Sequence, residues 1–510
     1  MFRKRLFLIL IIVAKLIYAQ DSFNKQHGID KKYTFAINEK VVYTLKNSGN
    51  WTTLTNGDRQ WALNLSRKGA SLISLLFNKF YLPQGAELRF STPNKNEAFT
   101  LTHDKNPKSR KLGSWPLSGD KIVLTYLEPN AVAGQGIIEI CQVVKGKSNK
   151  IVSNHSGKKV IGSTNECDVD AMCDIDNEIV NNLKSRLIHS VVLINTGFGS
   201  SCTGTLINNV NNDGKLYVLT ANHCIGNSDP AFWAFRFNFF NDQAICSDPE
   251  FQTFSDFQIL NGAKLLARNA KTDFALLEIE GTLNPDWNVE WAGWNNQKIA
   301  PKASFCLHHP LGRPTKLALD FHDALLDEIS FRDVQTKVWS IDPVFGSWDL
   351  GITSVGSSGS ALFNFKGQIV GQLLGGVAKC LVNFDNDKQD HYGRFDQSWN
   401  LSSNENESLQ KWLDPDNTGT ESIGMLSTEK KFNKNSLKIF PNPVSGKILS
   451  FNQLIKGGYK IYILSGIVLQ QIQNTFFSSV NVTTLNAGQY LIEITDQNGE
   501  KVVKHFLKSN

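Results

Sequence analysis

The sequence lacks several features that define whole classes of protein. Its 510 residues include three methionines, 15 prolines and eight cysteines with no CxxC pair, and no internal repeat of solenoid length is present. Beyond residue 20, no apolar run approaches the roughly 20 residues that a membrane helix needs. With 41% hydrophobic and 20% charged residues, the chain is not disordered, collagen-like or a coiled coil. It is a folded chain whose 38 glycines and 32 phenylalanines favour strands and turns.

The charge is distributed in blocks. The chain carries a net charge of +6, but residues 20–159 carry +11, residues 160–424 carry −15 and residues 425–510 carry +6. A length of 510 residues predicts two to four domains, and the electrical blocks indicate where they divide. The charge of the whole chain therefore says little about its partners.

The first 19 residues have the layout of a secretory signal peptide. Three basic residues near the start precede the apolar run Leu6–Ala14, and Ala19 offers a small residue before the cleavage point. Because the run is about half the length of a membrane span, we expect export and no permanent membrane span.

Three β-patterned blocks follow. Short apolar runs alternate with glycine, proline and asparagine, which is typical of strands and turns. The predicted organisation is a signal peptide over 1–19, a β-rich block over 20–159, the acidic block over 160–424, a linker over 425–435 and a last β-rich domain over 436–510.

Six cysteines fall in the acidic block. In an exported protein they predict disulfides, although six cysteines allow fifteen connectivities. The absence of a CxxC pair disfavours zinc, and Cys141 and Cys306 stand apart. The six are Cys167, Cys173, Cys202, Cys224, Cys246 and Cys380.

Three segments of the acidic block, VLTANHC, TDFALLEI and GSSGSA, together predict hydrolysis by a serine. Each alone is usually structural. In combination they supply Ser358 as nucleophile, His223 as the base that accepts and returns its proton, and Asp273 to orient the imidazole. The glycine-flanked turn also allows the backbone N–H groups of Gly356 and Ser358 to point at one oxyanion.

Residues 160–424 resemble the lysyl endopeptidase group of the trypsin/chymotrypsin superfamily. The resemblance is carried by TANHC and GSSGS, by GQLLGG and DHYGR further on, and by the ending WLDPDNTG. It implies an all-β, chymotrypsin-like double β-barrel with the triad between the barrels. It also implies the disulfide pairs Cys167–Cys380, Cys173–Cys246 and Cys202–Cys224.

The same resemblance places the specificity residue at Asp390. In this group an acidic residue at the floor of the primary pocket pairs with the lysine ammonium, whereas a surface aspartate is the alternative. The lysine-selective members carry an imidazole where this chain has Leu374, stacked near a tryptophan for which Trp339 and Trp348 are both candidates. Because Leu374 replaces the imidazole of the lysine-selective members, we expect the pocket to accept arginine as well as lysine.

His308 and His309 invite a metal interpretation. Neighbouring residues of a strand point to opposite faces, so the pair is a poor chelate and we interpret both as structural. We expect no metal and no cofactor.

The flanking blocks have their own resemblances. Residues 20–159 resemble the β-sandwich propeptides of such proteases, and their positive charge suggests pairing with the acidic block, a contact that salt would weaken. Lys158 and Lys159, just before Val160, offer a site for self-cleavage, with trimming by another protease as the alternative.

Residues 436–510 resemble the β-sandwich sorting domain of the type IX secretion pathway, through IFPNPVSG, LNAGQYLIEI and KVVKHFLK. An adhesion or carbohydrate-binding module is the alternative. The expected partner is the type IX export machinery, and the expected location is outside the cell or attached to its surface.

These observations predict a secreted serine endopeptidase that cleaves after lysine, with arginine also accepted. The rival interpretations are an arginine-preferring trypsin-like protease and an inactive, protease-like adhesin. We expect a monomer that acts on protein and peptide substrates. We expect no nucleic-acid partner, since the basic residues lie mainly in the segments to be removed.

Overall fold

The computed structural model describes residues 36–147, 167–197, 199–241, 246, 258–284, 286–341, 348–378, 389–427, 437–496 and 499–509. Contacts divide the chain into two compact units, Met1–Ser427 and Thr428–Asn510. The division falls inside the expected linker 425–435. The signal peptide, the cleavage region around Lys159 and the half-cystine Cys380 lie outside the described residues.

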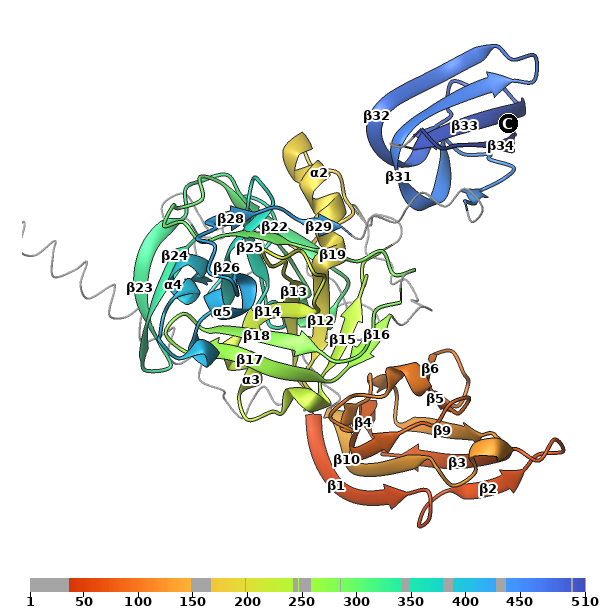
Figure 1. The fold of residues 1–510 in the computed structure, drawn as a ribbon, viewed down its shortest axis with the longest axis vertical. Coiled ribbons are helices and arrows are strands. Elements are labelled where there is room, and N and C mark those ends of the chain that lie inside the picture. The colour runs from red at the N-terminus through yellow and green to blue at the C-terminus, as the bar shows by residue number, and fades with distance from the viewer. Residues whose placement is uncertain are drawn as a thin grey trace, which may run out of the picture. The chain divides into compact units, whose positions relative to one another are not determined.

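The block predicted to be a propeptide, called the propeptide segment below, forms two five-stranded antiparallel sheets (Figure 1, red to orange). The alternation seen in the sequence is real, since every second side chain of KIVLTYLE is buried. The first sheet has the order β1-β10-β4-β7, with β8 on β4, and the second has the order β2-β3-β9-β5-β6. The strands are β1 (Ala36–Thr44), β2 (Asn50–Thr53), β3 (Arg59–Ser66), β4 (Ala70–Tyr81), β5 (Glu87–Ser91), β6 (Ala98–Thr102), β7 (Leu112–Gly113), β8 (Leu117–Ser118), β9 (Lys121–Glu128) and β10 (Ile137–Lys147).

The first half of the catalytic segment is built on a seven-stranded sheet. Strands such as YVLTA and FALLEI are almost entirely buried, which explains their continuous apolar runs. The strands, in sheet order, are β16 (Ile259–Asn261), β15 (Ala234–Phe237), β12 (Val191–Asn195), β13 (Ser201–Leu206), β14 (Tyr217–Ala221), β18 (Phe274–Ile279) and β17 (Ala263–Asn269).

The second half is built on a ten-stranded, mostly antiparallel sheet. Its main path runs β11-β22-β21-β25-β26-β27-β24-β23, and β20 joins β26 and β28. The predicted all-β fold is confirmed, because helices are few and short. The strands are β11 (Val169–Asp170), β20 (Gly293–Asn295), β21 (Ser304–His308), β22 (Lys316–Asp320), β23 (Leu325–Phe331), β24 (Val334–Ser340), β25 (Ala361–Asn364), β26 (Gln368–Gly376), β27 (Asp390–Arg394) and β28 (Ser422–Ile423).

Short helices and one small sheet complete this unit. The ten-residue helix α2 begins at Glu178, and the side chain of the preceding residue, Asn177, accepts a hydrogen bond from Val180 N and so caps the helix. The remaining elements are α2 (Glu178–Leu187), α3 (Asn222–Ile225), α4 (Phe395–Trp399), α5 (Gln410–Leu413), β19 (Glu290–Trp291) and β29 (Leu426–Ser427).

The propeptide segment packs on the seven-stranded sheet mainly through apolar side chains. One hydrophobic cluster contains its core together with Leu193, Ala234, Phe239 and Ile259 of the catalytic segment. Polar contacts surround this cluster, including a buried hydrogen bond from Asn261 Nδ2 to the carbonyl of β7 (2.6 Å). Apolar packing therefore contributes to this contact, and the pairing of the two block charges stays a prediction.

The second unit contains one five-stranded antiparallel sheet. Its order is β30-β31-β33-β34, with β32 on β31, and its core is a separate hydrophobic cluster. In the described part of the whole chain, no helix is long and apolar enough to cross a membrane. The strands are β30 (Ile439–Phe440), β31 (Ile448–Ile463), β32 (Val468–Asn481), β33 (Gly488–Asp496) and β34 (Lys501–Lys508).

Candidate active site

The register of two neighbouring strands brings His223 and Asp273 together. β14 and β18 are antiparallel and pair Ala221 with Phe274, so the residues just after one strand meet those just before the other. His223 Nδ1 lies 2.6 Å from Asp273 Oδ2, and His223 N donates to Asp273 Oδ1 at 2.9 Å. The carboxylate is 1% exposed, so both of its oxygens are committed to one histidine in a site shielded from water.

The segment before Asp273 is held from the other half of the domain. Gln372 Nε2 donates to the Thr272 carbonyl at 2.7 Å, and Ser398 Oγ donates to Thr272 Oγ1 at 2.8 Å. Asp273 itself has φ of 56°, a conformation that costs a non-glycine residue energy and persists only when its surroundings impose it. No local sequence signal marks Gln372 or Ser398 for this task.

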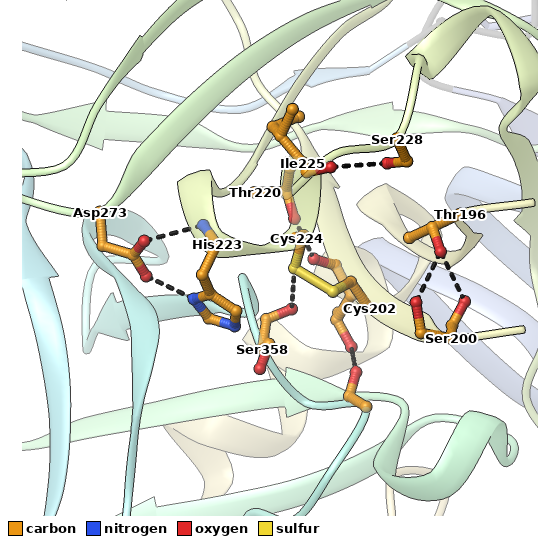
Figure 2. The surroundings of a disulfide bond; sticks show 12 residues. Thr196, Ser200, Cys202, Thr220, His223, Cys224, Ile225, Ser228, Asp273 and Ser358 are labelled. Atoms are coloured by element: carbon orange, nitrogen blue, oxygen red, sulfur yellow. Dashed lines mark hydrogen bonds and ion pairs between the residues drawn. A yellow bond between two sulfur atoms is a disulfide. The ribbon is translucent and has the colours of Figure 1, made fainter. Parts of the chain in front are cut away.

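Two of the three expected disulfide pairs are present. Cys202–Cys224 joins β13 to the helix that carries His223 (Figure 2), and Cys173–Cys246 is also formed. Cys167 is disulfide-bonded, while its expected partner Cys380 lies outside the described residues. The free cysteines of the described residues are Cys141 and Cys306. Burial raises the pKa of Cys306 to about 12, which keeps it a protonated, unreactive thiol.

Ser358 lies in the turn before β25, beside the imidazole on the side away from Asp273 (Figure 2). Within the described residues, no hydrogen bond joins Ser358 Oγ to His223, as is common in a protease site without substrate. Ser358 O accepts from Thr203 N at 2.8 Å and contacts the Cys224 sulfur at 3.9 Å. As a disulfide sulfur, Cys224 has no proton to donate, so this second contact is packing.

The turn before Ser358 presents two candidate oxyanion donors. Gly356 has φ of +98°, which glycine adopts without strain. Among the described residues, neither Gly356 N nor Ser358 N donates to another protein group. Two backbone N–H groups in one tight turn form the arrangement that binds a developing oxyanion.

Asp390 is the first residue of β27 and is 1% exposed. Its Oδ2 accepts from Thr353 Oγ1 (2.6 Å) and from Trp348 Nε1 (2.8 Å). Desolvation by burial raises the pKa of Asp390, and these hydrogen bonds lower it in part. Gly376 lies opposite, where an added Cβ would stand 1.9 Å from Asp390 Oδ1, so only glycine leaves room for the carboxylate.

The aromatic residue that packs in one cluster with Leu374 is Phe331. Leu374 packs in a small buried cluster with Phe331 and Val338, and Phe331 meets the His223 ring edge to face at 5.8 Å between centroids. Trp348 instead binds Asp390, and Trp339 lies in the core with its N–H on a backbone carbonyl. The sequence could not reveal Phe331, because it stands at the tip of a distant hairpin.

The same tip places Arg332 near the triad. Burial lowers the pKa of Arg332, while the charge of Asp273 raises it. The guanidinium is therefore close enough to the carboxylate of Asp273 to interact with its charge.

Groups that could hold a metal are few in the described residues. Asp320, His322 and Asp349 offer ligand atoms within 4.8 Å of one another. His322 Nδ1 already lies 3.2 Å from Asp320 Oδ1 and 3.5 Å from Asp349 Oδ2, an arrangement that stabilises the histidine without an ion. His308 and His309 bind different partners, Ser357 Oγ and Arg313 O, and form no shared chelate.

An all-β domain that places a histidine–aspartate pair and a serine on a glycine turn side by side belongs to the serine protease class. Residues 161–393 match the family model described as the C-terminal domain of lysyl endopeptidase. Residues 438–509 match the secretion system C-terminal sorting domain. The chain therefore carries a lysyl endopeptidase-like protease domain followed by a sorting domain, as the motifs indicated.

A curated relative agrees with this assignment. The chain is 26% identical over 343 residues to the lysyl endopeptidase of Pseudomonas aeruginosa strain PAO1. The match covers 65% of this chain and 71% of that protein. The solved Rv3671c protease of M. tuberculosis, in an inactive form, is 16% identical with a TM-score of 0.27 and covers 42% of this chain and 88% of its own. A serine endoprotease from Yersinia pestis is 15% identical with a TM-score of 0.27, and the match covers 43% of this chain and 64% of that one. At such TM-scores neither structure adds to the assignment.

The sorting domain also agrees with the location expected from the sequence. The protein is secreted or attached to the cell surface after export, and its C-terminal domain is the part that the export machinery recognises.

Proposed function

We propose that this serine protease is an endopeptidase that hydrolyses peptide bonds after lysine, with His223, Asp273 and Ser358 as its catalytic triad. The observation that carries the triad is the buried pair in which both oxygens of Asp273 bind His223, beside Ser358 on its glycine turn. The proposed preference for a cationic substrate side chain rests on Asp390, which is buried at the start of β27.

The proposed reaction follows from these positions. Ser358 Oγ attacks the carbonyl carbon of the scissile bond while His223 Nε2 takes its proton, and Asp273 stabilises the imidazolium. The N–H groups of Gly356 and Ser358 bind the oxyanion. His223 then gives the proton to the leaving amine, which leaves an acyl-enzyme on Ser358. A water molecule then attacks the acyl-enzyme with His223 again as the base. This step releases the carboxylic acid and restores Ser358.

Asp390 explains selectivity by its electrostatic cost. A buried carboxylate without a positive charge beside it is unfavourable, as its raised pKa indicates, and a lysine ammonium would supply that charge. A neutral side chain leaves that cost in place, so the pocket discriminates by charge. A lysine-bearing protein or peptide is therefore the substrate class that the site fits.

Arginine cleavage is the second candidate, and Leu374 favours it. This side chain is 1% exposed and apolar, so the pocket wall contributes no imidazole contact that would single out an ammonium. Both cations can then pair with Asp390.

The test is hydrolysis of matched lysyl and arginyl peptides by the processed protein and by its Ser358→Ala variant. Lysine cleavage that disappears in the variant supports the proposal. Equal or faster arginine cleavage keeps the triad and overturns the lysyl preference. Absence of turnover on both peptides would instead support the inactive, protease-like adhesin.

A further inference from the structure

Two fully buried histidines, His308 and His309, take no part in the proposed chemistry. Desolvation lowers the pKa of His308 to about 3 and that of His309 to about 4, so both rings are neutral at neutral pH. His309 Nδ1 bonds to the Arg313 carbonyl at 2.8 Å and its ring stacks on Phe239, which ties it to its own loop. His308 faces elsewhere, toward the turn that carries the nucleophile.

The His308 ring holds the residue next to the nucleophile. His308 Nδ1 lies 2.7 Å from Ser357 Oγ, which also accepts from Ser354 N at 3.1 Å. Ser357 is fully buried, and its own N donates to the Ser354 carbonyl at 2.9 Å. The Ser357 side chain therefore connects the histidine to both ends of the turn.

The chain just after His308 holds the preceding peptide. Leu311 N donates to the Val355 carbonyl at 2.6 Å. In a planar trans peptide the C=O and N–H groups point in opposite directions, so holding Val355 O also aims Gly356 N. The Ser360 N bond to Ser357 O (3.0 Å) aims Ser358 N in the same way.

Thr203 links the same loop to the peptide between Gly356 and Ser357, which lies between the two donor peptides. Its Oγ1 accepts from His309 N at 3.0 Å and donates to the Gly356 carbonyl at 2.9 Å. A Cβ at Gly356 would lie 2.8 Å from His309 O and 2.9 Å from Leu311 N, which shows how closely the loop and the turn pack. Glycine turns its peptide easily, so its orientation has to be imposed from outside.

We propose that residues 308–311 and Thr203 form a brace that orients the oxyanion donors Gly356 N and Ser358 N, with His308 as its positioning side chain. The inference rests on the proposed function, because it concerns the same nucleophile. The brace stabilises the transition state by fixing N–H groups that bind charge only as that charge develops. Ground-state binding in the Asp390 pocket does not depend on it.

The test compares His308→Leu with His308→Asn in the processed enzyme. Leucine removes the bond to Ser357, whereas the asparagine amide can restore a polar atom near the position of Nδ1. We expect His308→Leu to lower kcat about 10-fold to 100-fold, less than the roughly 10²–10³-fold loss of a direct oxyanion donor, with KM nearly unchanged. His308→Asn should recover most of that loss.

Active-site titration keeps the result independent of folding, because rates are then expressed per functional site. Binding of a peptidyl aldehyde, which forms an oxyanion on Ser358, should weaken in His308→Leu, while binding of the corresponding peptidyl alcohol, which Ser358 cannot attack, should not. His309→Leu is the matched control for burial, because it removes a buried imidazole but keeps the backbone N–H of residue 309 that donates to Thr203. It should lose comparable stability with a much smaller loss of kcat.

Two outcomes would overturn the brace: a wild-type kcat in His308→Leu at equal titrated sites, or a His308→Asn variant no better than the leucine variant. Failure of the proposed function would be visible separately, as wild-type enzyme without turnover that depends on Ser358.

Discussion

The two halves of the catalytic domain hold their functional groups by different means. The seven-stranded half carries His223 and Asp273, whose polar atoms are paired with each other beside a disulfide. The ten-stranded half carries Ser358 on a glycine turn and Asp390 as a buried carboxylate whose pKa is raised by desolvation. In the first half the polar atoms of the pair satisfy each other, although Gln372 and Ser398 of the second half hold Thr272. In the second half, Asp390 keeps a desolvation cost that its hydrogen bonds offset only in part.

The largest effect on activity should come from the half that carries His223 and Asp273. Asp273→Asn keeps the shape of the side chain but presents an amide where Nδ1–H needs an acceptor, which favours the wrong imidazole tautomer. We expect kcat to fall about 10⁴-fold with little loss of folding. Steady-state kinetics on a lysyl peptide, with circular dichroism as the control for folding, measure this. A fall below about 10-fold would remove Asp273 from the triad.

Asp390→Asn should separate function from stability in the second half. We expect kcat/KM for lysyl peptides to fall at least about 100-fold, since the buried ammonium loses its partner. The triad should remain active, as measured by reaction with an uncharged acylating ester.

The same variant should be more stable at neutral pH. Because the pKa of Asp390 is raised in the folded state, folding holds its proton more tightly, and stability falls as pH rises from the ordinary 3.8 through the raised pKa. Asparagine removes that cost, so we expect a gain of about 1 kcal/mol or more at pH 7 and none below the ordinary value. Urea unfolding at both pH values decides this, and a loss of stability at pH 7 would contradict a strained carboxylate.

Removal of the disulfide beside His223 should weaken the first half without disabling its chemistry. The pair Cys202→Ser and Cys224→Ser opens a loop with a sequence separation of 22, which predicts a loss of about 3 kcal/mol in the free energy of unfolding. Under conditions where the variant is folded, we expect kcat within a few-fold of wild type. A much larger loss of kcat would show that the disulfide also positions the histidine.

The smallest effect should come from charge at the propeptide contact on the first half. Lys111 Nζ lies 2.8 Å from Asp229 Oδ2, but both side chains are more than 40% exposed. Lys111→Ala should therefore cost no more than about 1 kcal/mol. Unfolding of the full Ser358→Ala proenzyme should depend little on salt, since the shared cluster is apolar. Strong destabilisation by salt would restore the electrostatic pairing inferred from the block charges.

Local patterns located the catalytic candidates because each stands in a short motif next to a strand. VLTANHC ends the buried strand β14, TDFALLEI begins β18, and the turn GSSGSA precedes β25. Those motifs could not reveal Phe331, whose position depends on a hairpin that lies apart from all three motifs in the sequence.

The sequence by itself determined the β class, the export signals and the residue types available for hydrolysis, because period, composition and motif are local properties. Tertiary structure decided which of these groups meet. The register of β14 and β18 joins His223 to Asp273, and the packing of residues 308–311 against the turn accounts for two histidines that the sequence presents only as a pair. Burial of Asp390 likewise depends on strands that close over it, so its altered pKa is a property of the fold.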